Sequence, residues 1–381
     1  MLHKNTRMHL QRGRCKAETR QLNIMSLLNK LDKRRLLLLW RAVRRTRINA
    51  DLWRYTVNRI KVLTENHERN TCINHPTNVM LELGNVCTLH CDTCPREHEY
   101  GKDMDIGFMP YDKATRVIDQ LMPYLDSIGL TGLGETFLYP HLLEVLKYIK
   151  QRKPNVVVTL STNANFKGYL SKVKPLLPYI DNLQFSVDGI SGVYSSIRHC
   201  DFATLKENIK QTVEWGQGDT VFMFNCVVNE NNMNHLLPIV EFADETGVAY
   251  VNFNLMSIVG MPNRPRSYYD LFQSEEFLKA RTELLEAAKQ FPKVRVSGLS
   301  YPQNPTFHDC IYPWEYPYIT WDGYYVPCCG KPFPKVLNFG NVFDTDDIMS
   351  VLNSEKARQF RQLWQNNKAP EFCHNCQLTN I

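Results

Sequence analysis

Three closely spaced cysteines are the residues of this sequence whose types and spacing point most directly to chemistry. Cys87-x3-Cys91-x2-Cys94 directly follows a short apolar segment that is typical of a buried strand. Iron–sulfur clusters are normally held by four cysteine thiolates. Three thiolates in one loop would bind three irons of a 4Fe–4S cluster and leave the fourth iron open to an outside ligand. Zinc stays open as an alternative, because two histidines lie nearby, His90 and His98.

A second group of cysteines lies near the C-terminus of the sequence. Its five members are Cys310, Cys328, Cys329, Cys373 and Cys376. Such clustering is typical of metal ligation rather than of cysteines scattered through a core. Four thiolates would complete a second 4Fe–4S cluster with no outside ligand. The same four would also suit a structural zinc ion.

The positive charge of the chain is concentrated at its N-terminus. Residues 1–50 contain fourteen Lys and Arg against two acidic residues, whereas the net charge of the whole chain is +6. Apolar residues recur at helical spacing from about residue 25 to 62, with Lys and Arg between them. This pattern predicts a basic amphipathic helix. It either packs its apolar stripe on the rest of the protein or lies on an anionic membrane surface.

The sequence contains no apolar run of the roughly 20 residues that a membrane-spanning helix needs. It also lacks an N-terminal segment with the features of a signal peptide. We therefore expect a cytoplasmic protein, with the basic helix as the candidate for peripheral contact with a membrane. No aromatic-interleaved RNA-binding motif accompanies the basic charge, which argues against nucleic acid as the partner.

From residue 78 onward, strand-like and helix-like segments alternate six times. The strand-like segments are 79–83, 127–133, 156–160, 182–187, 220–228 and 249–256. Helical patterns follow them near 111–124, 139–152, 169–178, 203–215, 234–246 and 274–290. This alternation predicts a parallel sheet with right-handed crossovers, and six units suit a partial barrel better than a closed one. Catalytic groups then belong at the C-terminal ends of the strands.

The composition changes past residue 290, where Pro, Tyr and Trp become frequent. Residues 318–326 predict a hairpin that turns at Asp322-Gly323, and a short helix is expected near 346–364. We therefore predict an α/β fold with three parts. A basic, mainly helical extension (1–75) precedes a partial (β/α)6 TIM-like barrel (76–290), and a small α+β iron–sulfur domain (291–381) follows it.

The first cysteine motif resembles the signature of the radical S-adenosylmethionine (SAM) superfamily. The segment Leu130-Thr-Gly-Leu-Gly-Glu135 is similar to that family's Gly-Gly-Glu motif. In the family, the open iron takes the amino and carboxylate groups of SAM. An electron then cleaves SAM to methionine and a 5′-deoxyadenosyl radical, which abstracts a hydrogen atom from substrate. The resemblance implies SAM as cofactor and an external electron donor such as flavodoxin or ferredoxin.

The resemblance also assigns SAM contacts at successive strand ends. The matching positions are Gly134, Glu135, Ser161, Asn163, Ser186, Asp188, Arg198 and Met256. Glycine lets the backbone approach a ligand closely, and a glutamate supplies a counter-charge to an ammonium group. One position departs from the family pattern: Thr93 stands where an aromatic residue usually precedes the third cysteine.

The C-terminal cysteines resemble the SPASM and twitch extensions of the same superfamily. Five cysteines fit the shorter twitch version, and Cys328 stands at the family's Gly-x4-Cys position after Gly323. The resemblance implies one auxiliary 4Fe–4S cluster, two clusters in all, with Cys329 as the spare thiol. The implied ligands are Cys310, Cys328, Cys373 and Cys376. The spacing looks like that of twitch-bearing cyclitol dehydrogenases.

An auxiliary cluster with four protein ligands has no open iron for substrate, so electron transfer is its expected role. A substrate radical that loses a proton and gives this cluster an electron is dehydrogenated. Epimerisation of the substrate is the alternative to dehydrogenation, and it needs a group that donates a hydrogen atom to the substrate radical. The candidate donors are Cys226, within a predicted strand and expected to face the barrel interior, and Cys200 after Arg198, although small buried cysteines are common in cores.

The resemblance implies either a sugar or cyclitol substrate or a ribosomal peptide. Residues 1–75 show no alternating strand pattern of the kind found in the leader-recognition modules of peptide-modifying relatives. We therefore favour the sugar or cyclitol, with peptide maturation by cross-linking or epimerisation as the alternative. The alternative to an enzyme is a non-catalytic protein, either an iron–sulfur electron carrier or a zinc-stabilised binding protein.

Overall fold

The computed structural model describes residues 50–65, 70–216, 218–302 and 310–377. A nine-stranded sheet runs in the order β7-β6-β5-β4-β3-β2-β1-β8-β9. Neighbouring strands from β1 to β7 pair in parallel. Their bounds are β1 (Asn78–Leu81), β2 (Ser127–Gly129), β3 (Val157–Thr162), β4 (Asn182–Ser186), β5 (Val221–Val228), β6 (Tyr250–Leu255) and β7 (Arg295–Gly298). The six predicted strands are confirmed, and β7 is an additional strand.

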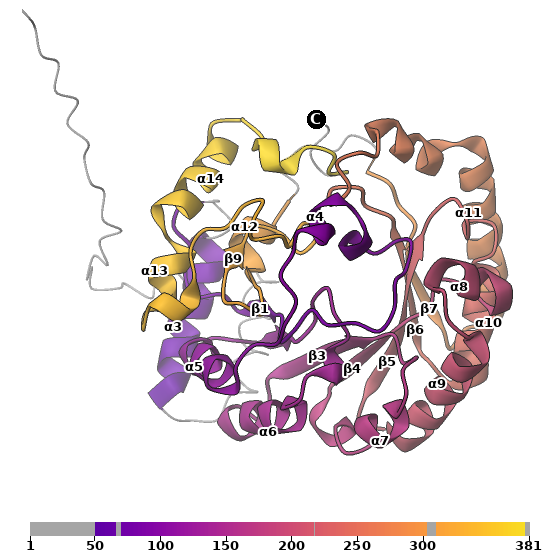
Figure 1. The fold of residues 1–381 in the computed structure, drawn as a ribbon, viewed down its shortest axis with the longest axis horizontal. Helices are drawn as coiled ribbons and strands as arrows, with labels where there is room; N and C mark the ends of the chain where they lie inside the picture. Colours follow the sequence, from indigo (N-terminus) through magenta and orange to yellow (C-terminus); the bar gives the residue numbers. More distant parts are fainter. Residues whose placement is uncertain (1–49, 66–69, 217, 303–309, 378–381) are drawn as a thin grey trace, which may run out of the picture.

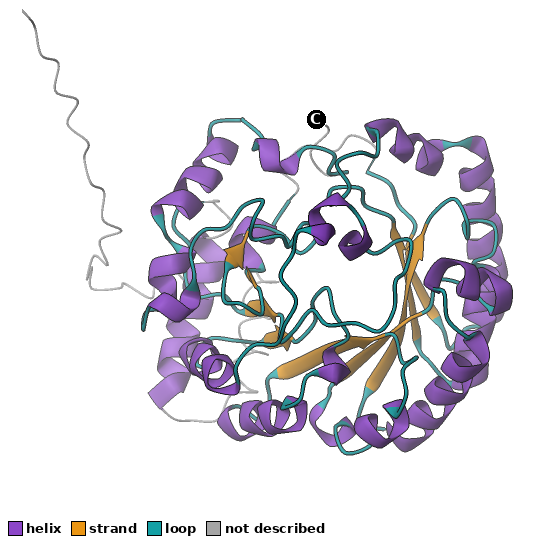
Figure 2. Cartoon of the chain, in the orientation of Figure 1, coloured by secondary structure: helices purple, strands orange, loops and turns teal. Residues whose placement is uncertain are grey.

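The helices that connect these strands cover the outer face of the sheet, which curves into an arc (Figure 1, Figure 2). They are α5 (Tyr111–Leu121), α6 (Leu142–Arg152), α7 (Tyr169–Val173), α8 (Ser191–Arg198), α9 (Phe202–Gly216), α10 (Leu237–Thr246) and α11 (Glu275–Ala287). The predicted helices are confirmed, and α8 is a further helix that the sequence pattern did not indicate. The result is the predicted partial barrel, with strand ends and loops turned to one side.

Side chains alternate between the two faces of each strand, as the pleat of a β-strand requires. In β5, Phe224, Cys226 and Val228 are buried, whereas Met223 and Asn225 between them are partly accessible. The buried set joins the hydrophobic core between sheet and helices. The partly accessible set faces the inside of the arc.

The C-terminal part of the chain extends the same sheet. Strand β8 (Tyr318–Ile319) pairs in parallel with β1, and β9 (Tyr325–Val326) returns antiparallel to β8, which confirms the predicted hairpin. Its turn contains Gly323 at φ 90°, a conformation that favours glycine. A Cβ on Gly323 would also lie 2.4 Å from Asn341 Oδ1.

The predicted helix near 346–364 consists of two helices. They are α13 (Ile348–Leu352) and α14 (Glu355–Gln365), and the short α12 (Tyr312–Glu315) precedes the hairpin. Ser354 separates α13 from α14, because its side chain caps α14 by accepting a hydrogen bond from the Ala357 amide. A serine within the apolar pattern is the signal that marks this break.

The basic N-terminal helix is described only in part. Most of the predicted segment, and residues 1–49 in general, lie outside the described residues. The described helix, α3 (Ala50–Glu65), packs on the end of the barrel, where Tyr55 donates a hydrogen bond to Asp126 and Arg59 forms an ion pair with the same carboxylate at 2.9 Å. Among the described residues, no helix has both the length and the apolar character needed to cross a membrane.

Arg361 joins several segments of the C-terminal part through its buried guanidinium group, which is 1% exposed. It donates to the carbonyl oxygens of Pro313 at 2.8 Å, Thr71 at 2.9 Å and Leu352 at 2.8 Å. It also donates to the Tyr325 hydroxyl at 3.2 Å. A buried charge of this kind is tolerated because its donors are satisfied.

We expect Arg361→Met to lower the free energy of unfolding by about 3 kcal/mol, because it leaves several buried acceptors without a donor. Thermal unfolding of the anaerobic protein measures the effect as a lower midpoint temperature. Lys356→Met, an exposed position on the same helix α14, is the matched control and should unfold like the wild type. Equal midpoints for the two variants would contradict the structural role of Arg361.

Candidate active site

The first cysteine motif lies in the loop after β1, at the C-terminal edge of the sheet. Cys91 is buried, whereas Cys87 and Cys94 are half-buried. The Cys94 amide donates to the Cys91 carbonyl at 3.0 Å, so the motif folds as a tight turn. The three thiols are near enough for their charges to interact, and burial raises the pKa of Cys91 to about 12. A buried thiol of this kind needs a cationic partner before it ionises.

Asn163, directly after β3, and Arg198, at the end of α8, contact these thiols from the barrel. Asn163 Nδ2 lies 3.8 Å from Cys87 Sγ, and Arg198 Nη1 lies 3.8 Å from Cys91 Sγ. Among the described residues, no three His, Cys, Asp or Glu side chains gather closely enough to hold a single metal ion. A 4Fe–4S cluster distributes its thiolates over several irons, so its ligands need not converge on one point.

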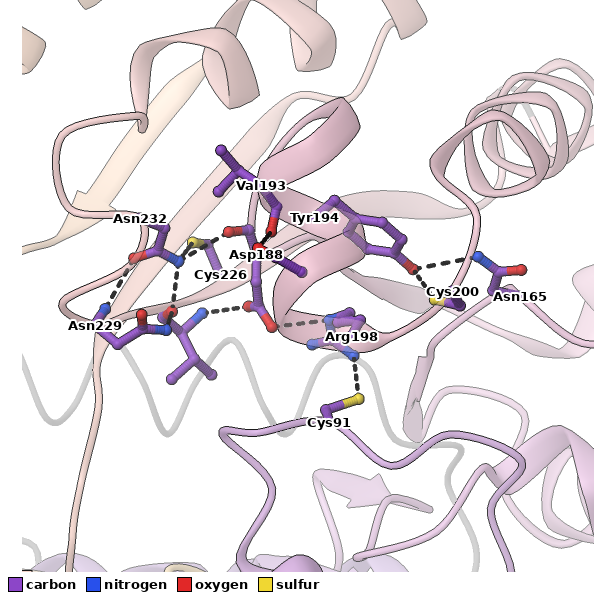
Figure 3. Close-up of polar contacts among 12 residues, drawn as sticks. Cys91, Asn165, Asp188, Val193, Tyr194, Arg198, Cys200, Cys226, Asn229 and Asn232 are labelled. Atoms are coloured by element: carbon purple, nitrogen blue, oxygen red, sulfur yellow. Dashed lines mark hydrogen bonds and ion pairs between the residues drawn. The ribbon is translucent and has the colours of Figure 1, made fainter.

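Arg198 is also paired with a buried carboxylate. Its Nε atom lies 2.8 Å from Asp188 Oδ2, and Asp188 Oδ1 accepts a hydrogen bond from the Val227 amide at 2.7 Å (Figure 3). Burial by itself would lower the pKa of Arg198, but the charge of Asp188 raises it. The pair therefore keeps a fixed cation next to Cys91.

Glu135 is a fully buried carboxylate beside the cysteine loop. It accepts hydrogen bonds from the amides of Phe137 at 3.2 Å and Asn163 at 2.7 Å, and from the Thr162 hydroxyl at 2.9 Å. Burial raises the pKa of Glu135 to about 7, although these hydrogen bonds act in the opposite direction. The side chain is therefore poised between its neutral and charged forms near neutral pH.

Gly134 and Glu135 are in direct contact with the cysteine loop. A Cβ on Gly134 would lie 2.6 Å from the Cα of Asn85, so only glycine fits at this position. The Glu135 amide donates to the Val86 carbonyl at 2.8 Å. The motif after β2 and the loop after β1 are thus held in direct backbone contact.

The remaining predicted SAM contacts are placed differently. Ser161 and Ser186 lie on the inner face of the sheet and are partly accessible. Met256 is buried just after β6, and its sulfur accepts a hydrogen bond from the Tyr268 hydroxyl at 3.3 Å. The structure therefore brings Glu135 and Asn163 directly to the cysteine loop, but not these three residues.

Uncharged polar side chains line the inner face from β2 to β7, and we call them the amide belt. Hydrogen bonds join neighbouring members, including Ser161 Oγ to Gln184 Oε1 at 2.8 Å and Asn225 Nδ2 to Gln184 Oε1 at 2.7 Å. The belt consists of Thr131, Ser161, Gln184, Asn225, Asn252, Asn254 and Ser297. Sequence reasoning missed it, although asparagines within otherwise apolar strands are a visible signal.

The two candidate hydrogen donors are not on this face together. Cys226 is fully buried on the helix-facing side of β5, opposite Asn225, so the prediction that it faces the interior is wrong. The Asn232 amide lies 3.7 Å from its sulfur. Cys200 is half-buried after α8 and donates to the Tyr194 hydroxyl at 3.4 Å, near the cysteine loop (Figure 3).

The C-terminal cysteines come together although they are far apart in the sequence. The charges of Cys310, Cys328 and Cys376 all act on Cys373, whose pKa is raised mainly by burial. The Gly330 amide donates to Cys328 Sγ at 3.2 Å. Amide donors of this kind commonly stabilise cluster-bound sulfur.

Cys329 has a different environment from its neighbour Cys328. It is hydrogen-bonded to the Tyr312 hydroxyl. Cys329 lies beside the other four thiols. That it is the spare thiol therefore stays a prediction.

The two cysteine groups are connected by direct packing. Tyr100, in α4 (Glu99–Lys102) after the first motif, packs its ring on Phe333, four residues after Cys329 of the second group, at a centroid distance of 5.7 Å. Gly260 lies between the two segments: a Cβ there would be 3.2 Å from both the Pro95 Cβ and the Gly330 carbonyl oxygen. The second thiol group is therefore built against the loop of the first.

Family models agree with this architecture. The model described as the radical SAM superfamily matches residues 81–243, and the SPASM model, described as an iron–sulfur cluster-binding domain, matches residues 310–377. The chain is a radical SAM enzyme with a C-terminal SPASM domain. Its cofactors are S-adenosylmethionine and 4Fe–4S clusters.

Individual relatives are distant. A curated protein of Pyrococcus furiosus, the tungsten-containing aldehyde ferredoxin oxidoreductase cofactor-modifying protein, is 23% identical over 78% of this chain and 86% of its own length. Streptococcus suis SuiB bound to the precursor peptide SuiA has a TM-score of 0.60 at 18% identity, over 87% of this chain and 76% of that one. Native anSMEcpe with bound AdoMet has a TM-score of 0.57 at 18% identity, over 80% and 88%. The structural likenesses describe the fold.

We expect SAM to bind the wild type about tenfold more weakly at pH 6 than at pH 8. The reason is that Glu135, with a pKa raised to about 7, is mostly neutral at the lower pH and loses its attraction for the ammonium group of SAM. Equilibrium dialysis of the reconstituted, oxidised protein measures this. Glu135→Gln should bind weakly at both pH values, while the exposed control Glu144→Gln should behave like the wild type. An unchanged pH dependence in Glu135→Gln would rule out this role.

Proposed function

We propose that this radical SAM enzyme dehydrogenates a neutral, hydroxyl-bearing substrate of the sugar or cyclitol type, with an auxiliary 4Fe–4S cluster as electron acceptor. The observation that carries the proposal is the second thiol group, gathered from distant segments and packed against the first cysteine loop. A cluster in that position would accept an electron close to where substrate is oxidised. We assign residues 76–290 to the catalytic barrel and 291–381 to the auxiliary domain.

The chain's own residues have distinct roles in this proposal. Cys87, Cys91 and Cys94 would hold the first cluster, and SAM bound there supplies the hydrogen-abstracting radical. Glu135 would bind the ammonium group of SAM. Arg198, held by Asp188, would face the carboxylate of SAM while remaining next to Cys91.

The electrons balance as follows. With one electron from the external donor, SAM held at the first site would supply a radical that removes one hydrogen atom from a carbon of the substrate. The substrate would then lose a proton from its hydroxyl to solvent and one electron to the auxiliary site, so the C–OH group would become a carbonyl. A ferredoxin or flavodoxin suits the role of donor, and the basic segment within residues 1–75 is the candidate for contact with an anionic surface.

The amide belt supports an uncharged substrate. Carboxamides such as Gln184, Asn225 and Asn252 both donate and accept hydrogen bonds, which matches hydroxyl groups that do the same. Asn254 and Ser297 are exposed on this face, so the belt is accessible from the inside of the arc.

Peptide maturation is the second candidate. The fold resembles SuiB bound to its precursor peptide and anSMEcpe bound to a peptide, the latter with a TM-score of 0.51. Backbone amides of a peptide would also pair with the belt. Epimerisation is the remaining variant, and Cys200 is the candidate hydrogen donor for it, because Cys226 lies on the opposite face of β5 from the belt.

We expect Cys310→Ala to leave SAM cleavage intact and to lower product formation at least tenfold, because the auxiliary site loses one of four proposed ligands. Anaerobic assays with dithionite measure 5′-deoxyadenosine and oxidised product side by side. Cys329→Ala, which removes the proposed spare thiol next to the same site, is the matched control and should retain both. Unimpaired product formation by Cys310→Ala would contradict electron transfer through this site.

A further inference from the structure

Lys331 is a buried cation beside the C-terminal thiols. Its side chain is 6% exposed, and its ammonium group donates to the Phe372 carbonyl oxygen at 3.2 Å. The ammonium also lies over two aromatic rings, 4.8 Å from the centroid of Tyr100 and 4.7 Å from that of Phe372. These contacts shield most of the side chain from solvent and stabilise the cation weakly.

No carboxylate within the described ranges forms an ion pair with Lys331. Glu371 is the carboxylate whose charge acts on it, and that side chain is exposed to solvent. A buried ammonium with one carbonyl acceptor is costly unless an anion faces it. The other groups whose charges act on Lys331 are Cys328 and Cys373, two of the proposed auxiliary ligands.

An auxiliary cluster would supply the missing anion. Four thiolates outweigh the positive charge of an oxidised 4Fe–4S core, so the complete site is anionic, and it becomes more so when it is reduced. We propose that Lys331 is the buried counter-cation of the auxiliary cluster and raises its reduction potential. This inference rests on the proposed function, which places the cluster there.

The aromatic surroundings explain how the charge remains effective. A carboxylate partner would offset part of the field of the ammonium, as Asp188 does for Arg198 at the first motif. The rings of Tyr100 and Phe372 hold the cation without neutralising it, and burial limits its screening by solvent. The field therefore favours the reduced form of the auxiliary cluster, which is the form that results when it accepts an electron.

Tyr100 also relates the position of Lys331 to the first cysteine motif. It belongs to α4, directly after the first cysteine motif, so the lysine is packed between a residue of the first loop and Phe372, the neighbour of Cys373. The cation thus lies on the side of the auxiliary site that faces the first motif. An electron arriving from substrate would reach a cluster whose positive partner is already in place.

The test is an EPR-monitored redox titration of the auxiliary cluster in the full chain. A background with Cys87→Ala, Cys91→Ala and Cys94→Ala removes the first cluster, so one signal remains. Lys331→Met should shift the midpoint potential to a more negative value, whereas Lys331→Arg should leave it near the wild-type value. Lys335→Met removes an equal charge from an exposed lysine paired with Asp105, and it should cause no shift.

Lys331→Gln keeps a donor for the Phe372 carbonyl but removes the charge, so it gives the same comparison if the methionine variant does not retain iron. An unchanged midpoint in an iron-loaded Met or Gln variant would overturn the inference and leave the proposed function intact. Failure of the proposed function is recognised separately. In that case, the background protein with Lys331 intact holds zinc and gives no auxiliary EPR signal, and the inference falls with it.

Discussion

The contact between the cysteine loop and the motif after β2 is the constraint on which the rest of the site depends. Gly134 approaches the backbone of Asn85 so closely that no side chain fits between them, and the Glu135 amide fixes the distance through the Val86 carbonyl. Parallel pairing of β1 with β2 brings the two loops to the same edge of the sheet. The loop that carries the thiols is therefore held against Glu135, the residue whose carboxylate has a raised pKa.

Electrostatics distinguishes the two thiol groups. The first has a cation, Arg198, that is already balanced by Asp188 and contacts Cys91. The second has Lys331, a cation enclosed by rings and a carbonyl. Burial raises the pKa of thiols at both places, so each group requires positive charge before it can bind as thiolate. The fold supplies part of that charge in both cases.

Local patterns were sufficient to predict much of this architecture. The strand–helix alternation predicted the strands from β1 to β6, and the turn residues Asp322 and Gly323 predicted the hairpin. Strand β7 was missed because it is short and mostly exposed. The face of Cys226 was misassigned because β5 is apolar on both faces, although polar Asn225 marks the inner one. Contacts such as that of Arg198 with Cys91 join residues that are far apart in the sequence. No local sequence pattern predicts such contacts.

The measurement that tests the central claim most directly is a count of iron, sulfide and zinc per chain after anaerobic reconstitution. It compares the wild type with the variant that lacks Cys87, Cys91 and Cys94. Two clusters predict roughly eight irons in the wild type and roughly four in the variant, because each complete site holds four. About four irons with one zinc in the wild type would contradict the account, since the C-terminal site would then be structural.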